Sequence, residues 1–510
     1  MDFKKYNNLI ELFFEKYEKQ QKDKIFLSSL KDSQNSFSWE QVKTKVINFA
    51  SEISKLIKTG DRCLLISENR PEWMISDLSI MLAGGITVPA YTTYLSRDYE
   101  YIINDCTPSI IIVSNDEQFN KIKNICEKNT SIKKIFSFEK LTGIDEKSYF
   151  NLEKLIKNKN NIEEIQIPNS MKRSDPACII YTSGTQGNPK GVILSHGGIL
   201  SNCEGGYKLL KPILEKETRF LTWLPLSHSY EHAVQFIQIA VGARVYYAES
   251  IDKLLKNMSE CSPHIMTAVP RFYQNLHQKI NSTFNKAKGL KRILVKYTTN
   301  LGTKKFRKDK MSLLEKLLNF IVENLVRKKI KKQFGGSLKT FVSGGGALDP
   351  EIGTFLNAIG LPTLQGYGLT ETSPVVSCNI PGKIKIETVG PPFKTNEVKI
   401  AEDGEILVKG ENVMLGYWNM KKETDDIIKN GWLHTGDIGE ITKDGNLKIT
   451  DRKKEIIVNL GGDNISPSKI ENLLCLNEKI KQSFVYGDKK TYLVALIVSE
   501  SEKNKKEIEY

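Results

Sequence analysis

Short apolar runs rich in β-branched residues alternate with helical stretches up to about residue 170, and this alternation restricts the chain to few folds. The runs include Cys63–Ser67, Thr87–Ala90 and Ile110–Ser114, and helical patterns at Trp39–Lys58 and Asp98–Asp105 lie between them. Strands that alternate with helices form βα units, whose strands pair as a parallel sheet. The sequence therefore predicts an α/β fold for this part of the chain.

The alternation resumes after a polar connector that runs from Lys157 to Asp175. From Thr388 the pattern changes to short strands with tight glycine turns at 402–405, 429–432 and 443–446, which is typical of hairpins. A β-rich subdomain should therefore follow the α/β part, and the chain becomes mixed again after Asp451–Lys454. The strands that we expect after the connector lie at Ala177–Thr182, Arg219–Leu224, Arg244–Tyr247, Ile265–Ala268, Thr340–Val342 and Thr363–Gln365.

The composition is that of a globular protein without a membrane span. Of the 510 residues, 40% are apolar and 26% are charged, and the mean hydropathy is −0.34. No apolar run reaches the ~18 residues that a bilayer requires, because the best candidate, Asp77–Leu95, contains a charge, glycines and Pro89. The N-terminus has no signal-peptide pattern. The eight cysteines are scattered without a CxxC pair, which favours a reducing, cytoplasmic location over a zinc site or a disulfide framework.

The basic charge of the chain is concentrated in one window. The net charge is +14, and Lys286–Lys332 holds 16 basic and 3 acidic residues, so this window supplies +13 of the total. A local patch does not indicate a nucleic-acid-binding protein. Apolar residues of the window fall on one face of a helix, and most such faces pack on a core. The neighbouring cations favour instead a helix on an anionic membrane surface, at the inner face of the membrane. The residues of this face are Leu314, Leu317, Leu318, Ile321, Leu325 and Val326.

The strongest functional signal is a loop rich in glycine and hydroxyl side chains, from Tyr181 to Gly191, that directly follows an apolar strand. Glycines let the backbone approach an anion closely, hydroxyl and amide groups donate to phosphate oxygens, and Lys190 neutralises charge. The loop is not a Walker A motif, because Pro189 and Gly191 flank the lysine. An ordinary hairpin turn is the alternative interpretation.

Four segments of the chain, in order, resemble the motifs of the adenylate-forming superfamily, which includes acyl-CoA synthetases, luciferases and peptide-synthetase adenylation domains. The loop is similar to the phosphate-binding signature of that superfamily, and Gln365–Thr372 to its adenine and magnesium segment. Trp432–Asp437 resembles its ribose-binding turn, and Ile449–Lys454 the hinge between its two domains. The resemblance extends from about residue 10 to about residue 500.

The resemblance implies an α/β architecture in two domains. The large domain, residues 1–450, would contain two doubly wound α/β subdomains and a β-rich subdomain. Residues 451–454 would form the hinge, with Lys454, and residues 455–510 a small, incomplete α+β domain.

The resemblance also implies roles for individual residues. Activation of a carboxylate at the α-phosphorus of ATP requires phosphate neutralisation and a metal rather than a nucleophilic side chain. Thr370 would position the α-phosphate and Glu371 would ligate Mg²⁺, which prefers carboxylate and phosphate oxygens. The phosphates would be held by Thr182, Ser183, Gly184, Thr185 and Lys190. The other residues that would bind ATP or AMP are Gly345, Gly346, Gln365, Gly366, Tyr367, Gly368, Asp437 and Arg452.

Three of these residues have a specific expected partner. Tyr367 offers a ring to adenine, Asp437 is suited to accept hydrogen bonds from the ribose hydroxyls, and Arg452 is suited to bind ribose or phosphate. A hairpin-turn aspartate and a surface ion pair are the alternative interpretations of Asp437 and Arg452.

His228 lies in the segment Leu224–His232, where the family places a histidine or an aromatic residue beside the acyl pocket and the α-phosphate. A structural histidine is the alternative interpretation. A hydrolase is excluded, because the chain has no Gly-x-Ser-x-Gly elbow to pair with a histidine.

The implied function is ATP-dependent activation of a long-chain fatty acid to acyl-AMP and its transfer to coenzyme A. The basic insertion and the segment around His228 favour the long-chain branch of the synthetases. In the family a C-terminal lysine enters the site for adenylation, and Lys503, Lys505 and Lys506 do not match its segment. We therefore expect impaired adenylation. Two alternatives stay open, a ligase that passes the acyl group to a carrier protein or another acceptor, and a non-catalytic nucleotide- or lipid-binding relic.

Overall fold

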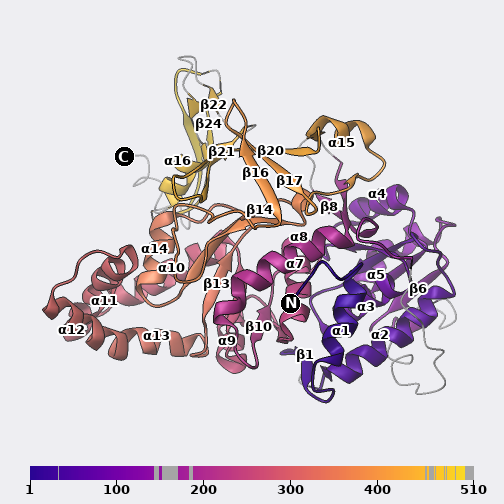
Figure 1. The fold of residues 1–510 in the computed structure, drawn as a ribbon, viewed down its shortest axis with the longest axis horizontal. Helices are drawn as coiled ribbons and strands as arrows, with labels where there is room; N and C mark the ends of the chain where they lie inside the picture. The colour runs from indigo at the N-terminus through magenta and orange to yellow at the C-terminus, as the bar shows by residue number, and fades with distance from the viewer. Residues whose placement is uncertain are drawn as a thin grey trace.

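The computed structural model shows two α/β layers beside a strand-rich part that leads to the C-terminus (Figure 1). It describes residues 1–32, 34–142, 149–151, 170–182, 188–453, 457–458, 464–465, 467–475, 477, 479–488 and 490–499.

Within the described residues, one eight-stranded sheet has the strand order β15-β14-β13-β12-β10-β11-β1-β2. The six central strands are parallel, and the antiparallel strands β2 and β15 lie at its two edges. Its strands are β1 (Ile25–Ser29), β2 (Ser36–Ser38), β10 (Arg219–Thr222), β11 (Arg244–Tyr247), β12 (Ile265–Ala268), β13 (Thr340–Ser343), β14 (Thr363–Gly368) and β15 (Val375–Cys378).

A second described sheet of eight strands has the order β18-β9-β8-β4-β3-β5-β6-β7. Its strands are parallel from β8 to β7, whereas β9 runs antiparallel to both of its neighbours, β8 and β18. They are β3 (Arg62–Ile66), β4 (Ile86–Ala90), β5 (Ile110–Val113), β6 (Lys134–Ser137), β7 (Tyr149–Asn151), β8 (Pro176–Thr182), β9 (Lys190–Ser195) and β18 (Gly416–Tyr417).

Helices cover both faces of each sheet, so that helical and sheet layers alternate. The largest apolar core lies between the two sheets and includes residues of five helices, which are α1 (Leu9–Glu18), α2 (Trp39–Ser54), α3 (Pro71–Leu82), α7 (His196–Leu210) and α8 (Ser229–Val241). A second core joins the outer face of the sheet that contains β3 to α4 (Ser96–Cys106) and α5 (Asp116–Cys126).

The outer face of the sheet that contains β12 is covered by another group of helices. Its core includes residues of α9 (Leu254–Cys261), α10 (Pro270–Asn285), α13 (Lys328–Gln333) and α14 (Pro350–Ala358). Next to them lie α11 (Leu290–Arg307), α12 (Leu313–Val322) and a π-helical turn, η2 (Glu323–Arg327). Short 3₁₀ turns occur at η1 (Lys211–Ile213) and η3 (Thr370–Thr372).

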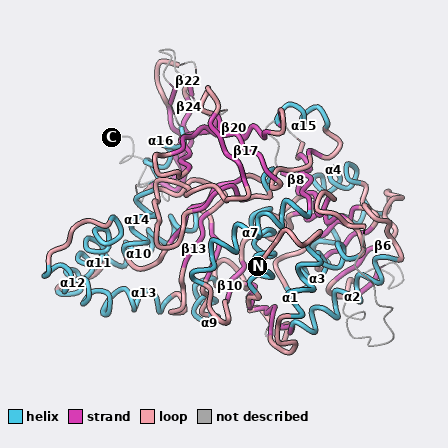
Figure 2. Tube along the Cα trace, viewed as in Figure 1, coloured by secondary structure: helices cyan, strands magenta, loops and turns pink. Residues whose placement is uncertain are grey.

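The part of the chain after Thr388 is mostly strand and loop (Figure 2). The three expected glycine turns are present, and Gly404, Gly431 and Gly445 each have a positive φ, between 76° and 84°. Each turn joins two antiparallel strands. The elements are β16 (Asn396–Ile400), β17 (Glu405–Gly410), α15 (Lys421–Ile427), β19 (Ile428–Lys429), β20 (Trp432–Ile441) and β21 (Leu447–Arg452).

After β21 the described elements are both helical and extended, as expected for a small α+β unit. They are β22 (Ile457–Val458), β23 (Asn464–Ile465), α16 (Pro467–Cys475), β24 (Ile480–Tyr486) and β25 (Val494–Ser499). The predicted hinge residue Lys454 lies outside the described residues. No helix within the described ranges is long and apolar enough to cross a bilayer.

The structure confirms the α/β architecture and each expected strand, and it corrects one expectation. The apolar face predicted in the basic window belongs to α12 and η2 rather than to one regular helix, because the π-helical turn interrupts the helical period. All eight cysteines are free.

Candidate active site

The predicted phosphate loop lies at the end of a hairpin. Strands β8 and β9 are antiparallel, and their register places Thr182 directly opposite Lys190. The loop residues Ser183, Gly184 and Thr185 lie outside the described residues, so only the base of the loop is placed. The described strands on either side of the predicted phosphate segment therefore form a hairpin.

Tyr417 joins the base of this loop to the predicted metal ligand. Its hydroxyl donates a 2.8 Å hydrogen bond to Glu371 Oε1, and Lys190 Nζ lies 4.9 Å from the centre of its ring. Burial and the Glu371 charge raise the pKa of Tyr417, so the phenol keeps its proton. Strand β18 pairs with β9 and opposes Tyr417 to Val192, which holds the ring beside the loop.

Thr370 and Glu371 lie in η3, which follows β14. The Thr370 hydroxyl is 3.1 Å from Ser229 Oγ in the first turn of α8. His228 is the residue that caps this helix, and its Nδ1 accepts a 3.1 Å hydrogen bond from the Tyr230 N–H. Burial lowers the pKa of His228, which favours the neutral ring. The structure therefore gives His228 a structural hydrogen bond and also places it next to the Thr370 segment.

A second group of contacts links the adenine segment to the β-rich subdomain. The Tyr367 hydroxyl donates to Asp437 Oδ2 at 2.7 Å, and Arg452 Nε donates to Asp437 Oδ1 at 3.1 Å. Asp437 and Arg452 are directly opposed in the β20–β21 hairpin. The Asp437 side chain is 5% exposed, and burial raises its pKa, whereas the two hydrogen bonds oppose this rise.

The glycines of the site lie where the backbone permits close approach. Gly345 follows β13 and has a φ of +75°, a conformation that favours glycine. Gly368 lies against the Pro374 backbone, so a side chain there would displace the chain. Gly366 lies within β14, and Gly346 lies three residues after the end of β13.

The side chain of Gln365 is hydrogen-bonded to backbone groups of the protein. Its carbonyl accepts from the Leu348 N–H at 2.7 Å, and its amide donates to Ile386 O at 3.0 Å and to Thr388 O. These hydrogen bonds give its side chain a structural role, and its backbone N–H and carbonyl are both hydrogen-bonded to Asn379.

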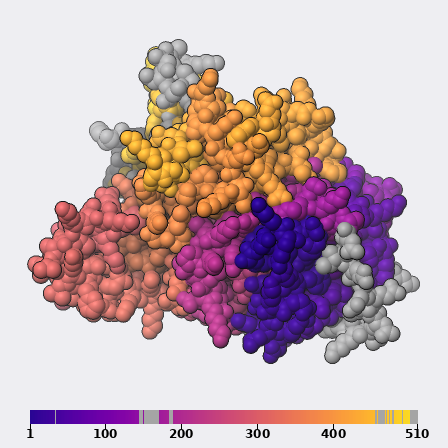
Figure 3. All heavy atoms as spheres, in the orientation of Figure 1, coloured from indigo at the N-terminus to yellow at the C-terminus, as the bar shows by residue number. Residues whose placement is uncertain are grey.

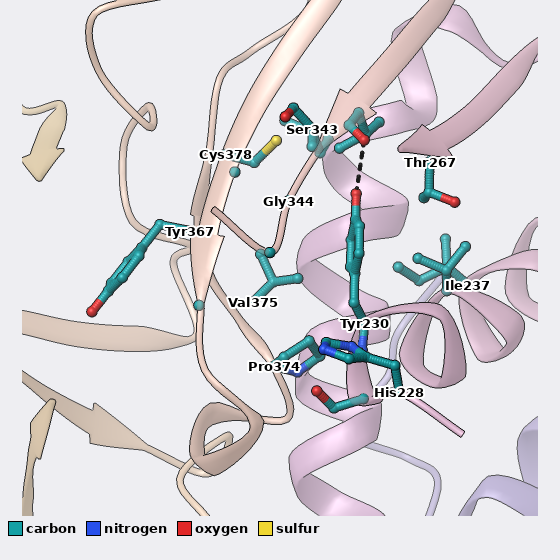
Figure 4. Close-up of a pocket in the computed structure, with 18 of the residues that line it drawn as sticks. His228, Tyr230, Ile237, Thr267, Ser343, Gly344, Tyr367, Pro374, Val375 and Cys378 are labelled. Carbon is teal, nitrogen blue, oxygen red and sulfur yellow. Dashed lines mark hydrogen bonds between the residues drawn. The ribbon is translucent and has the colours of Figure 1, made fainter. Parts of the chain in front are cut away.

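An apolar cavity of about 810 Å³, its open mouth included, lies beside these groups (Figure 4). Thr370, His228 and Gly345 are among the residues that line it. Figure 4 shows Tyr230 reaching across the cavity to its hydrogen bond with Val342 O, whereas Tyr367 points away from Tyr230. The remaining wall is largely apolar and includes Leu209, Leu210, Phe220, Val234, Ile237, Ile265 and Phe393.

The cavity follows the strands of the sheet. Ile265 and Thr267 of β12 both line it, because alternate residues of a strand face the same side. The cavity therefore lies along β12 and presents mainly apolar side chains.

One buried acid lies behind the cavity wall. The Thr267 hydroxyl donates a 2.6 Å hydrogen bond to Glu231 Oε2, and burial raises the pKa of Glu231 to about 7. Because the Thr267 hydroxyl is hydrogen-bonded to Glu231, Thr267 contributes its methyl group to the cavity wall.

The structure thus brings most of the predicted residues into two adjoining groups. Thr370, Glu371, Lys190 and His228 lie around Tyr417 and the cavity, and Tyr367, Asp437 and Arg452 form a connected set. Sequence reasoning missed Tyr417 and Ser229. The Gly416-Tyr417-Trp418 segment was an available signal, because two adjacent aromatic residues follow a glycine there.

The residues present suit a magnesium ion held together with phosphates. Among the described residues, no cluster of three or more His, Cys, Asp or Glu side chains could hold a metal. Magnesium is usually bound by one or two carboxylates plus substrate phosphates, so Glu371 beside the loop base is a sufficient protein ligand.

Comparisons with solved structures identify the fold. The structure of anthranilate CoA ligase AuaEII with anthranoyl-AMP superposes with a TM-score of 0.77 at 21% identity, and covers 100% of this chain and 91% of that one. The structure of O-succinylbenzoate coenzyme A synthetase of Bacillus subtilis with AMP superposes with a TM-score of 0.71 at 20% identity. It covers 97% of this chain and 89% of that one. The fold is therefore that of the adenylate-forming enzymes.

Sequence comparison identifies the family. The model of the AMP-binding enzyme family matches residues 14–418. Long-chain-fatty-acid–CoA ligase FadD15 of Mycobacterium bovis is 30% identical over 454 residues, which are 88% of this chain and 75% of that protein. Long-chain-fatty-acid–CoA ligase 5 of Rattus norvegicus is 31% identical over 468 residues, which are 86% of this chain and 67% of that protein. The chain belongs to the AMP-binding enzyme family and is a ligase.

Proposed function

We propose that the chain is an acyl-CoA synthetase that activates a long-chain fatty acid with ATP and transfers it to coenzyme A. The observation that carries this proposal is the apolar cavity that is lined by Thr370, His228 and Gly345. A fatty acid in this cavity would bury its chain among apolar side chains and direct its carboxylate toward Thr370. The curated relatives that are named long-chain-fatty-acid–CoA ligases support the same substrate class.

The first half-reaction joins the fatty acid to AMP. A carboxylate oxygen attacks the α-phosphorus, the bond from that phosphorus to its bridging oxygen breaks, and pyrophosphate leaves. Lys190 and the hydroxyl of Thr182, at the base of the loop, would hold the phosphates during this displacement, and Thr370 would orient the α-phosphate. Positioning and charge neutralisation are the means by which proteins accelerate phosphorus chemistry of this kind.

Magnesium, when bound, supplies further positive charge at the phosphates. Glu371 would hold it, and the Tyr417 hydroxyl would keep one carboxylate oxygen oriented. Asp437 would accept from the ribose hydroxyls, and Tyr367 and Arg452 already fix the direction of its two oxygens.

The second half-reaction exchanges AMP for a thiol. The thiol of coenzyme A releases its proton to solvent, its sulfur attacks the acyl carbon, the carbon–oxygen bond to the phosphate breaks, and AMP leaves. His228, kept neutral by its lowered pKa, lies next to the Thr370 segment and would line the path of the acyl carbonyl.

The chain-length assignment is tested at the wall of the cavity. Val234 lines it from α8 and is 7% exposed. The variant Val234→Phe should lower kcat/KM for palmitate about tenfold more than for octanoate, because a larger ring shortens the space for the distal carbons while overpacking costs ~1–3 kcal/mol. Val234→Ala, with the same backbone and a smaller side chain, is the control. Equal losses for both acids in a folded Val234→Phe variant would contradict this use of the cavity.

A further inference from the structure

One side of α12 and η2 carries large apolar side chains that face solvent. Leu313 is 85% exposed, Phe320 68% and Leu314 65%. Leu317, Ile321 and Leu325 are also exposed, at 58%, 37% and 48%. We call these six residues the α12 apolar face. Isolated exposed apolar residues are ordinary, but a contiguous group on one helix marks a surface that meets another apolar phase.

The helix that presents this face is firmly attached by its opposite side. Val322 is 1% exposed, and the buried guanidinium of Arg327 donates to Ala358 O and Thr298 O at 2.8 Å each. Arg327 also donates to Asn319 Oδ1 at 2.9 Å. Because these contacts fix α12 against α11 and α14, the exposed face is a feature of the folded protein. Arg327 is thus a structural residue rather than one of the surface cations that the charge of the window implies.

The surroundings of the face are strongly basic. Of the three acids between Lys286 and Lys332, Glu315 pairs with Lys304, and Glu323 pairs with Lys305 and Arg327. Within the described chain, many exposed cations of this segment have no carboxylate partner, among them Lys308, Lys310, Lys316, Lys328, Lys329 and Lys332. Lys316 lies one helical turn from both Leu313 and Phe320, so charge and apolar surface adjoin.

The position of the segment leaves it accessible. Figure 1 places α11, α12 and α13 together at one end of the molecule, away from α15 and β20, and Figure 3 shows residues 286–332 as a lobe at that end. A flat surface can therefore meet α12 without contact with the α/β core of residues 1–250. With 10 residues, α12 is about 15 Å long at ~1.5 Å per residue, too short to span a bilayer but suited to lie in its interface.

We propose that the α12 apolar face docks the protein on an anionic lipid bilayer. Leu314, Leu317 and Phe320 enter the boundary between headgroups and acyl chains, and the flanking lysines bind the anionic headgroups. A second copy of this chain fits the surface less well, because two such faces would place their unpaired cations against each other. The docking does not depend on the proposed ligase activity, since neither Lys190 nor Glu371 contributes to this surface.

The apolar half of the proposal is tested by vesicle sedimentation with the full chain. Wild type should pellet with phosphatidylglycerol-containing vesicles, and the triple variant Leu314→Gln, Leu317→Gln, Phe320→Gln should bind at least about tenfold more weakly, since each lost apolar side chain forfeits its transfer free energy. The matched control is Leu95→Gln with Ile251→Gln, which are 58% and 71% exposed on other parts of the protein. The control should bind as wild type does.

The charged half is tested with Lys310→Gln, Lys316→Gln and Lys329→Gln in one variant, with Arg327 intact. Binding should fall at least about tenfold, because each cation near an anionic surface contributes ~1 kcal/mol. The control variant changes the exposed Lys383, Lys394 and Lys443 to Gln. Wild-type binding should also weaken from about 0.01 M to about 0.15 M salt, as the Debye length falls from ~30 to ~8 Å.

Two results would overturn the proposal. One is negligible pelleting of wild type with anionic vesicles at low salt. The other is concentration-dependent self-association of wild type, measured by sedimentation velocity without lipid, that the Leu314, Leu317 and Phe320 variant abolishes, since the face would then be an interface between copies.

Discussion

The hydroxyl of Tyr417 donates a 2.8 Å hydrogen bond to the carboxylate of Glu371, and the two residues are 46 positions apart along the chain. The same tyrosine presents its ring to Lys190. One side chain therefore connects the base of the predicted phosphate loop to the proposed metal ligand. If this geometry matters for the reaction, the hydroxyl of Tyr417 should influence turnover without being a reacting group.

Removal of this hydroxyl should slow adenylate formation. The variant Tyr417→Phe keeps the ring beside Lys190 but frees one Glu371 oxygen, and a hydrogen bond to a charged group is worth about 1.5–3 kcal/mol. We expect kcat to fall about tenfold, with the KM for the fatty acid unchanged and with a higher Mg²⁺ requirement. Tyr492→Phe, at a tyrosine that is 64% exposed, is the control. An unchanged Mg²⁺ requirement would refute a positioning role for Tyr417.

Neutralisation of Glu371 should have a larger effect. Glu371→Gln retains the size of the side chain and an oxygen that can accept from Tyr417, but it loses the charge that would hold magnesium. We expect most acyl-adenylate formation to be lost, at least about a hundredfold, as for other groups that stabilise charge in a transition state. Fatty-acid binding, measured by calorimetry, should change little. Near-normal activity would remove Glu371 from the site.

Lys190→Ala should weaken the use of ATP without unfolding the protein, because the contact of Lys190 that the structure shows is with the ring of Tyr417. We expect an increase of about tenfold in the KM for ATP, equivalent to ~1.4 kcal/mol, and a melting temperature close to that of wild type. Lys190→Arg keeps the charge and should recover part of the affinity. An unchanged dependence on ATP in a folded Lys190→Ala protein would show that the loop is not the phosphate cradle.

The buried pair of His232 and Asp77 predicts a specific dependence of stability on pH. His232 Nε2 lies 2.9 Å from Asp77 Oδ2. Burial is the largest single effect and lowers the pKa of His232, but the charges and hydrogen bonds of Asp77 and Cys178 together outweigh burial and raise the pKa from 6.5 to about 10. The contribution of the pair to stability is complete below pH 6.5 and is lost as the pH rises through about 10, because the folded state binds the proton more tightly.

Urea unfolding between pH 6.5 and 10 measures this contribution. One bound proton corresponds to a slope of about 1.4 kcal/mol per pH unit, so the free energy of unfolding should decrease over this range. His232→Gln should be less stable at pH 6.5 and should lack that part of the slope, whereas His277→Gln should keep it. Identical slopes for His232→Gln and wild type would mean that the pair is not protonated in the folded state.

Local patterns were sufficient to predict the elements but not all their partners. The hairpins at Gly404, Gly431 and Gly445 were predicted because a glycine turn and its two strands adjoin in the sequence. In contrast, β1 pairs with β11, more than two hundred residues away, and no local signal specifies a partner at that distance. The early βα units and the N-terminal hairpin therefore belong to different sheets.

The site residues also divide into those in contact within one local hairpin and those brought together from distant parts of the chain. Asp437 and Arg452 were predicted from motifs, and their direct opposition follows from the hairpin that contains them. Tyr417 was missed because its role arises only when β18 joins β9, far earlier in the chain. Gln365 was assigned to the nucleotide although its side chain is committed to Leu348, Ile386 and Thr388, contacts that only the folded chain creates.

The central claim is AMP-forming activation of a long-chain fatty acid, and the most direct test measures pyrophosphate, AMP and palmitoyl-CoA with palmitate and ATP, with and without coenzyme A. The account predicts palmitate-dependent pyrophosphate release, and conversion to palmitoyl-CoA and AMP when coenzyme A is added. Pyrophosphate release without thioester formation would point to a carrier protein or another acceptor. ATP binding without any palmitate-dependent pyrophosphate release would contradict the claim and identify the chain as a non-catalytic nucleotide-binding protein.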